Sequence, residues 1–317
     1  MNVAVCTLFE GDYHHGVAAL ANSLCTGGFR GTIYAGYRGD LPTWALSAIL
    51  SENGHRVMNL AIDVEISFVP LETQAHFTNY KPDFMMELWD GPARDAAAMI
   101  YVDPDIVFNV PWRFFNDAIQ CGVLLCEDVN SPIHRNHPSR AGWRRYFPDL
   151  KKSDNDLFVN GGFVGVPAEA RVFIERWRIL MARIAGILGS TAANALDGNC
   201  LPVEVFADCF SQPDQDALNA AMDDSPDITF SILGRQAMGF YPGRCLVPHS
   251  QGYRKDKPWR RHYLFEFLGG KPPSAADKAF WRYAGLGPLK TFSSTRISFI
   301  RTKIAVASFL SRFYCRG

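Results

Sequence analysis

The stretch Met99-Ile100-Tyr101-Val102-Asp103-Pro104-Asp105-Ile106-Val107 decides how the rest of the sequence is interpreted. Its first four residues form a short apolar run typical of a buried strand, and the two aspartates lie between that run and a second one. Residues released at the carboxyl end of a strand in an open α/β sheet face a crevice and not the core. Carboxylates are costly to bury unless a cation holds them, so Asp103 and Asp105 predict a divalent-metal site. On this stretch alone, a turn or bulge with two exposed aspartates is an equal alternative.

The pattern around this stretch predicts an α/β fold. Short apolar runs alternate with amphipathic stretches through the first 130 residues, which is typical of β-α-β units that build a Rossmann-like, mostly parallel sheet flanked by helices. A helix is expected to open at Lys81-Pro82 and to continue through residues 84–89. We expect the other helices at 17–24, 41–50 and 168–188, and strands at 3–8, 32–37, 57–62, 66–69, 99–102, 122–126 and 158–166.

Composition excludes some functions. The chain has 317 residues, of which 48% are hydrophobic, enough to bury a large core. Its 32 basic residues balance 32 acidic ones, and this zero net charge excludes a dedicated, globally basic nucleic-acid binder. Eight cysteines without a C-x-x-C pair predict buried, reduced thiols, and no basic, apolar leader precedes Glu10. These features together predict a cytoplasmic protein.

The C-terminal segment has a charge pattern of its own. Eight basic residues and no acidic one follow Asp277, and they alternate with large apolar residues. We therefore expect a catalytic domain over residues 1–270 and a basic, apolar helical extension over 271–317. Such a helix can make peripheral contact with the inner face of an anionic membrane, although a helix packed on the core is the alternative because its apolar positions do not form one clean face.

Further motifs occur on both sides of the metal stretch. Thr7, Tyr13 and Gly16 lie in the first loop and helix, and Lys81 precedes the metal strand. With the metal stretch, these motifs resemble the GT-A glycosyltransferases, most closely the retaining enzymes of family 8, which include glycogenin and bacterial lipopolysaccharide glycosyltransferases. The resemblance spans roughly residues 3–259. Its remaining motifs are Val159-Asn160-Gly161-Gly162-Phe163, Asp214-Gln215-Asp216-Ala217-Leu218-Asn219, His249-x-x-Gly252 and Lys257-Pro258-Trp259.

The resemblance implies a role for each motif. It makes Asp103, Asp105 and His249 the ligands of Mn²⁺ or Mg²⁺, and it makes Asp214 and Gln215 the catalytic pair at the donor sugar. In the family the lysine near the closing motif contacts the diphosphate; here Lys255 stands at the usual spacing and Lys257 two residues later, so both stay candidates. The donor-binding residues implied by the resemblance, together with the strand-end acid Asp128, are Thr7, Tyr13, Lys81, Asp103, Asp128, Asn160, Gly161, Gly252, Lys255 and Lys257.

The function implied is hexosyl transfer. The donor is a nucleotide-diphosphate sugar, expected to be a UDP-sugar, and the acceptor is a hydroxyl of a saccharide, glycolipid or protein, with retention of anomeric configuration. A metal-dependent nucleotidyltransferase and a non-catalytic nucleotide-sugar-binding module are the alternatives. The acidic loop over residues 9–16 lacks the Gly-x-Gly-x-x-Gly pattern of a dinucleotide site and counts against a dehydrogenase.

Several of these residues also have a purely structural interpretation. Asp214 follows Pro213 at an expected helix start, where an aspartate caps free backbone N–H groups. Thr7 and Tyr13 are as well explained by core packing. Arg140, with Trp143 and two further arginines, predicts a solvated basic face more readily than contact with an anionic acceptor.

Overall fold

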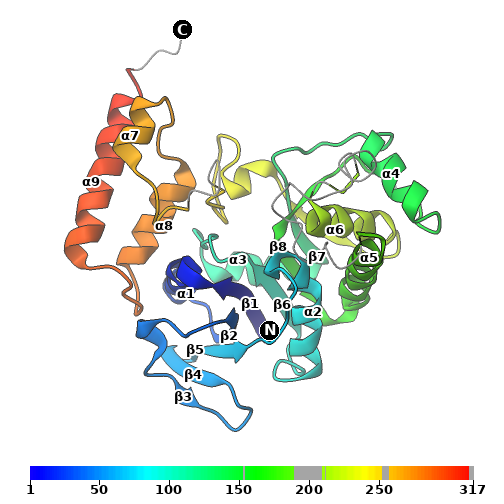
Figure 1. Ribbon diagram of the computed structural model, residues 1–317, viewed down its shortest axis with the longest axis horizontal. Helices are drawn as coiled ribbons and strands as arrows, with labels where there is room; N and C mark the ends of the chain where they lie inside the picture. Colours follow the sequence, from blue (N-terminus) through cyan, green and yellow to red (C-terminus); the bar gives the residue numbers. More distant parts are fainter. Residues whose placement is uncertain (153, 189–208, 211, 252–256, 314–317) are drawn as a thin grey trace. The chain divides into compact units, whose positions relative to one another are not determined.

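A computed structural model describes residues 1–152, 154–188, 209–210, 212–251 and 257–313 of the chain. Its strands form one mixed, mostly parallel sheet, hydrogen-bonded in the order β3-β4-β5-β2-β1-β6-β8-β7-β9 (Figure 1). The strands are β1 (Val3–Glu10), β2 (Gly31–Arg38), β3 (Ile49–Leu50), β4 (Arg56–Ala61), β5 (Val64–Pro70), β6 (Ala98–Val102), β7 (Val123–Glu127), β8 (Val159–Pro167) and β9 (Phe230–Leu233). The α-helices are α1 (His14–Gly27), α2 (Phe77–Asp90), α3 (Trp112–Ala118), α4 (Pro138–Tyr146), α5 (Val172–Leu188), α6 (Pro213–Asp223), α7 (Tyr263–Leu268), α8 (Ala275–Gly285) and α9 (Ser294–Leu310). This arrangement confirms the predicted α/β class and the Rossmann-like sheet with flanking helices.

Two predicted helices differ from the structure. The stretch 41–50 is not a helix: it forms a 3-10 turn at Thr43–Ala45 and then β3. Its apolar residues Leu46 and Ile49 are exposed, so no apolar face packs on the core to stabilise a helix there. Helix α2 begins at Phe77, before the predicted start at Lys81, because the His76 side chain accepts a hydrogen bond from the backbone N–H of Thr78.

The chain forms two compact units that interleave along the sequence. The predicted boundary near residue 270 between a catalytic domain and a C-terminal extension stays a prediction. Unit 1 comprises Met1–Cys6, Leu71–Tyr101 and Asn116–Arg235. Unit 2 comprises Thr7–Pro70, Val102–Phe115 and Gln236–Gly317.

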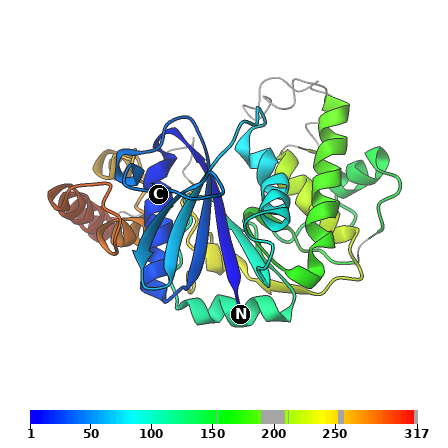
Figure 2. The ribbon, with the colours of Figure 1, turned by 90° about the horizontal axis from the view of Figure 1, so that it is seen from below.

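Unit 1 packs helices α2, α5 and α6 together (Figure 2). The first residues of β1 pair in parallel with β6, from Val3 with Ala98 to Cys6 with Tyr101, and β7 pairs antiparallel with β8 and parallel with β9. The Trp177 indole of α5 donates to the backbone oxygen of Asp214, so α5 fixes the first turn of α6.

Arg140 of α4 is part of the interior of unit 1. Its guanidinium is 1% exposed, and one of its nitrogens lies 2.6 Å from both carboxylate oxygens of Asp223. The neighbouring Trp143 indole donates to the backbone oxygen of Cys209. The predicted solvated basic face is therefore wrong for Arg140, whose charge is neutralised inside the unit.

In unit 2, the buried side chain of Asn22 joins α1 to the C-terminal segment by hydrogen bonds. Asn22 of α1 donates to the backbone oxygens of Tyr283 and Leu289 and accepts from the backbone N–H of Leu289. Gly287 (φ +84°) turns the chain at this point, where an added Cβ would lie 2.6 Å from the Asn22 side-chain oxygen. In Figure 1, α8 and α9 run side by side. None of the described helices combines the length and apolar character that a bilayer-crossing helix needs.

The six described cysteines are free thiols, but they are not uniformly buried. Cys6, Cys126 and Cys209 are buried as predicted, whereas Cys121 is exposed at the end of a 3-10 turn. Cys200 and Cys315 lie outside the described residues.

Candidate active site

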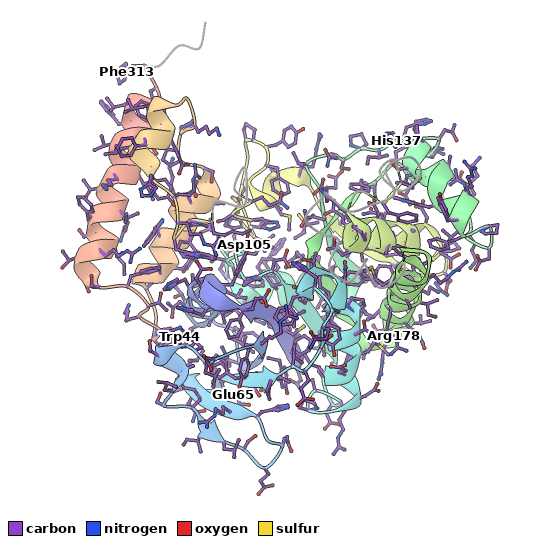
Figure 3. All side chains as sticks on the ribbon, in the orientation of Figure 1. Trp44, Glu65, Asp105, His137, Arg178 and Phe313 are labelled. Atoms are coloured by element: carbon purple, nitrogen blue, oxygen red, sulfur yellow. The ribbon has the colours of Figure 1, made fainter. Side chains whose placement is uncertain are left out.

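Asp103, Asp105 and His249 converge in unit 2. Each offers a ligand atom, and these atoms all lie within 4.8 Å of one another. The His249 Nε2 atom is 3.4 Å from Asp105 Oδ1 and 3.9 Å from Asp103 Oδ2. Asp105, labelled in Figure 3, is only 3% exposed, so the alternative of two solvent-exposed aspartates in a turn is wrong for this residue.

Backbone pairing brings His249 to the aspartates. An isolated antiparallel bridge joins Ile106 to His249, and the backbone N–H of Ser250 donates to the Asp105 oxygen at 3.1 Å. On the other side, the His249 N–H donates to the Met238 oxygen at 3.0 Å. These bonds hold the His249 imidazole beside Asp103 and Asp105, although His249 is almost 150 residues away from them in the sequence.

The chemistry of this group fits a divalent cation. The two carboxylates supply the oxygen ligands that Mn²⁺ and Mg²⁺ take together with substrate oxygens, and the imidazole adds one nitrogen ligand. Burial raises the pKa of Asp105, but the Lys257 ammonium and the His249 imidazole outweigh it and hold that pKa below its ordinary value. The carboxylate is therefore ionised at neutral pH. His249 Nδ1 is buried without a hydrogen-bond partner in the described chain, while Nε2 faces the two carboxylates.

Lys257 adds a second positive charge to this group. Its ammonium lies 2.5 Å from Asp105 Oδ2 and 5.5 Å from the centre of the Tyr13 ring. Burial lowers the pKa of Lys257, but the Asp105 carboxylate more than offsets this and leaves the pKa raised. Tyr13 in turn packs edge-on against Trp259. Thr7, which is also predicted to bind the donor, is fully buried in β1. Its hydroxyl has no hydrogen-bond partner among the described residues.

The lysine at the family spacing, Lys255, lies outside the described residues, as does Gly252. Both stay predictions as diphosphate contacts.

Gly16 of α1 packs closely against Pro104, which lies between the two metal-site aspartates. A Cβ at this position in α1 would lie 2.1 Å from the Pro104 oxygen and 3.2 Å from the Trp259 ring. Only glycine lets the first turn of α1 approach the loop between the two aspartates so closely. Its place in the first-loop motif indicated proximity to the nucleotide, whereas this packing role has no signal in the sequence beyond a glycine inside a helix.

Lys81 and Asp214 form a buried ion pair in unit 1. The Lys81 ammonium donates at 3.0 Å to Asp214 Oδ2 and at 3.0 Å to the Gly161 oxygen, and it lies 5.3 Å from the centre of the Tyr101 ring. Both charged side chains are less than one-tenth exposed. Gln215 accepts from the Gly161 N–H at 3.2 Å, and its Nε2 is buried without a partner in the described chain. The structure thus groups four of the predicted residues: Lys81, Gly161, Asp214 and Gln215.

Asp128 and Asn160 form a second buried contact in unit 1. Asn160 donates to Asp128 Oδ2 at 2.7 Å and accepts from the Gly162 N–H at 2.9 Å. Asp128 also accepts from the Asn130 backbone N–H. Asp128 is therefore a buried, hydrogen-bonded carboxylate at this strand end.

The remaining residues of the Asp-Gln-Asp-x-x-Asn motif anchor α6. Asp216 accepts from the backbone N–H of Gln212 at the start of the helix, so this aspartate contributes to satisfying the helix terminus. Asn219 accepts from the Val159 N–H and donates to the Val159 oxygen, which clamps α6 to β8.

Asp216 predicts a measurable pH dependence of stability. Burial raises its pKa to about 7, with further contributions from Asp214 and Asp128. The folded protein then holds a proton that the unfolded chain releases above about pH 4, so the free energy of unfolding falls by about 1.4 kcal/mol per pH unit up to about pH 7. We expect Asp216→Asn, which mimics the protonated side chain, to remove this slope in guanidinium unfolding. A slope that persists unchanged in the variant contradicts the assignment.

Comparisons with known proteins were made by sequence and by structure. No protein family and no curated protein matches the sequence. By structure, the chain is similar to a galactosyltransferase, LgtC, crystallised in complex with donor and acceptor sugar analogs, with a TM-score of 0.49. The two chains are 14% identical, and the alignment covers 95% of this chain and 99% of that one.

Proposed function

We propose that the protein is a metal-dependent glycosyltransferase that moves a hexose from a UDP-sugar to a hydroxyl acceptor with retention. The observation that carries this proposal is the convergence of Asp103, Asp105 and His249 with ligand atoms within 4.8 Å, at the position where the motif resemblance expects a donor-binding cation. The proposals that the anomeric configuration is retained and that the donor nucleotide is UDP rest on the motif resemblance.

For the diphosphate part of the donor, the motif resemblance supports the residues around the candidate cation site. Asp103, Asp105 and His249 would hold the cation, which when bound neutralises charge on the departing diphosphate. We assign Lys257 the role of a second positive charge at the diphosphate, because its ammonium lies 2.5 Å from Asp105 and stays protonated. A fixed positive charge beside the leaving oxygen stabilises the developing charge without reorganisation.

For the sugar part of the donor, the motif resemblance supports Asp214, Gln215 and Asn160, together with the strand-end acid Asp128. The Gly161 N–H orients the Gln215 side chain, and the unpartnered amide nitrogen of Gln215 is available to a sugar oxygen. Lys81 holds the Asp214 carboxylate in one orientation, in which it can accept from hydroxyl groups of the hexose. Asp128 and Asn160 are assigned to further sugar hydroxyls.

The experiment that tests this function is hydrolysis of a panel of UDP-hexoses with Mn²⁺ and no acceptor. A glycosyltransferase slowly releases UDP and free hexose from its own donor, and mass spectrometry identifies which hexose is released. A non-catalytic module releases none. A nucleotidyltransferase instead forms pyrophosphate from UTP and a hexose 1-phosphate, so this second mixture distinguishes the remaining alternative.

A further inference from the structure

The turn that carries Lys257 is closed by a backbone hydrogen bond. The Arg260 N–H donates to the Lys257 oxygen at 2.8 Å, which folds residues 257–260 into one turn. Lys257 opens this turn, and its ammonium lies at the candidate cation site, 2.5 Å from Asp105 Oδ2. A lysine side chain is long and flexible, so its ammonium keeps one place only when the surroundings hold its backbone. The position of this turn therefore decides where the charge of Lys257 lies.

The 3-10 turn Gly11–Tyr13 holds the 257–260 turn from one side. Asp12 accepts from the Trp259 indole N–H at 3.0 Å and from Arg260 Nε at 2.6 Å. Partial burial raises the pKa of Asp12, but the hydrogen bonds from Arg260 and Trp259 outweigh it and leave that pKa lowered. Asp12 is therefore ionised at neutral pH, and both bonds are charge-assisted. They fix the third and fourth residues of the turn.

Tyr263 of α7 holds the turn from another side. This side chain is 1% exposed, and its hydroxyl donates to the Pro258 oxygen at 3.1 Å. Pro258 follows Lys257 directly in the chain, and a proline has only its carbonyl to offer to a backbone hydrogen bond. The Tyr263 hydroxyl thus binds the backbone at the residue next to Lys257.

Helix α8 fixes the Tyr263 hydroxyl in turn. The Trp281 indole N–H donates to this hydroxyl at 2.9 Å, and Asp277 Oδ1 lies 3.3 Å away as a second acceptor. Asp277 is 2% exposed, and its Oδ2 accepts from Arg261 and from the Ser274 hydroxyl. Burial raises the pKa of Tyr263, so the hydroxyl keeps its proton and stays a donor. A hydroxyl with three partners has a defined orientation.

This chain of contacts crosses the boundary that the sequence predicts near residue 270. Tyr263 lies before that boundary, whereas Asp277 and Trp281 belong to the predicted C-terminal extension. A phenylalanine at position 263 would pack as well and would not require the burial of a hydroxyl, which is costly unless it is hydrogen-bonded. The tyrosine therefore indicates a role for its bond to Pro258.

We propose that Tyr263 is a positioning residue of the candidate site: its hydroxyl holds the Pro258 backbone and thereby keeps the Lys257 ammonium beside Asp105. The placement of Lys257 is argued from contacts within unit 2 alone. Its consequence for the diphosphate of a donor rests on the proposed function. Removing the hydroxyl takes a donor from the Pro258 oxygen, so the turn can shift and the ammonium should leave Asp105 more often.

Competitive acetylation of the full chain, without donor or metal, tests the placement of Lys257. Its side chain is 14% exposed and ion-paired, so it should react slowly with acetic anhydride, and peptide mass spectrometry gives the rate of each lysine. Tyr263→Phe, which removes only the hydroxyl, should raise the rate of Lys257 about fivefold, since one hydrogen bond contributes about that factor. The rate of Lys81 in unit 1 should stay constant. An unchanged rate of Lys257 would overturn the proposal.

A double-mutant cycle on UDP affinity in saturating Mn²⁺ tests whether the hydroxyl acts through Lys257. Calorimetry should show UDP binding about fivefold weaker in Tyr263→Phe and about 30-fold weaker in Lys257→Met. The double variant should bind about as weakly as Lys257→Met alone, because no ammonium is left to position. Losses that multiply in the double variant would show a general structural role of the hydroxyl and overturn the proposal.

Tyr283→Phe is the matched control, because this hydroxyl of α8 donates to Asn109 Oδ1 at 3.4 Å, outside the 257–260 turn. Its UDP affinity and its Lys257 acetylation rate should equal those of the wild type. Equal effects of the two tyrosine variants would overturn the assignment of Tyr263. Absence of UDP binding by the wild type would instead overturn the proposed function, and the acetylation rates would still decide the placement of Lys257.

Discussion

Replacing Asp103 by asparagine is expected to lower the Mn²⁺-dependent hydrolysis of the preferred UDP-hexose by roughly 10³-fold, or about 4 kcal/mol in the barrier. Asparagine keeps the size of the side chain but removes the negative charge that a divalent cation requires. Asp103 is chosen because it is more exposed than Asp105, so its charge can be removed without leaving Lys257 buried and unpaired. The measurement is the initial rate of UDP release with saturating Mn²⁺.

Asp154→Asn is the matched control, because Asp154-Asn155-Asp156 repeats the Asp-x-Asp spacing and Asp154 is exposed. Its side chain is 92% exposed and only loosely paired with Arg135, so its rate should equal that of the wild type. Equal rates for Asp103→Asn and wild type would contradict the metal assignment. An unchanged melting temperature of Asp103→Asn ensures that a loss of rate does not reflect unfolding.

Lys81→Met is expected to lower the free energy of unfolding by about 3–5 kcal/mol. Methionine matches the length of the lysine stem but removes the ammonium that lies 3.0 Å from the buried Asp214 carboxylate and 3.0 Å from the Gly161 oxygen. A buried carboxylate deprived of this cation carries most of the cost, because its desolvation is no longer compensated. Guanidinium unfolding at neutral pH, followed by circular dichroism, measures the change.

The double variant Lys81→Met/Asp214→Asn removes both charges and should be more stable than Lys81→Met alone. Arg171→Met is the control at a more exposed pair, Arg171 with Asp90, where a loss of about 1 kcal/mol or less is expected. A small effect of Lys81→Met, similar to that of Arg171→Met, would contradict the role assigned to the buried pair.

All strands of the described sheet except β3 and β9, and the acidic strand end, could be predicted from local sequence. Each predicted strand occurs within two residues of its expected bounds, because an apolar run is a local signal. The Asp103 and Asp105 pair was found for the same reason. His249 reaches these residues through a backbone bridge to Ile106, a contact between distant segments that no local pattern encodes, and only the motif resemblance linked it to the metal.

The ion-pair partners of the buried charged residues could not be predicted from the sequence. Arg140 lies in a polar stretch that predicts a solvated face, yet its partner Asp223 is 83 residues away. Lys81 and Asp214 are 133 residues apart, so the resemblance could suggest a role for each but not their contact. The helix predicted at 41–50 is absent for a related reason: helix formation there depends on packing against distant residues, and its apolar residues Leu46 and Ile49 are exposed.

Calorimetric titration of the wild-type protein with UDP, with Mn²⁺ and then with excess EDTA, tests the central claim most directly. The account predicts binding that requires Mn²⁺ and that is lost in Asp103→Ala and in Asp105→Ala. Absence of UDP binding with Mn²⁺, or equal binding in the two aspartate variants or in EDTA, would contradict it.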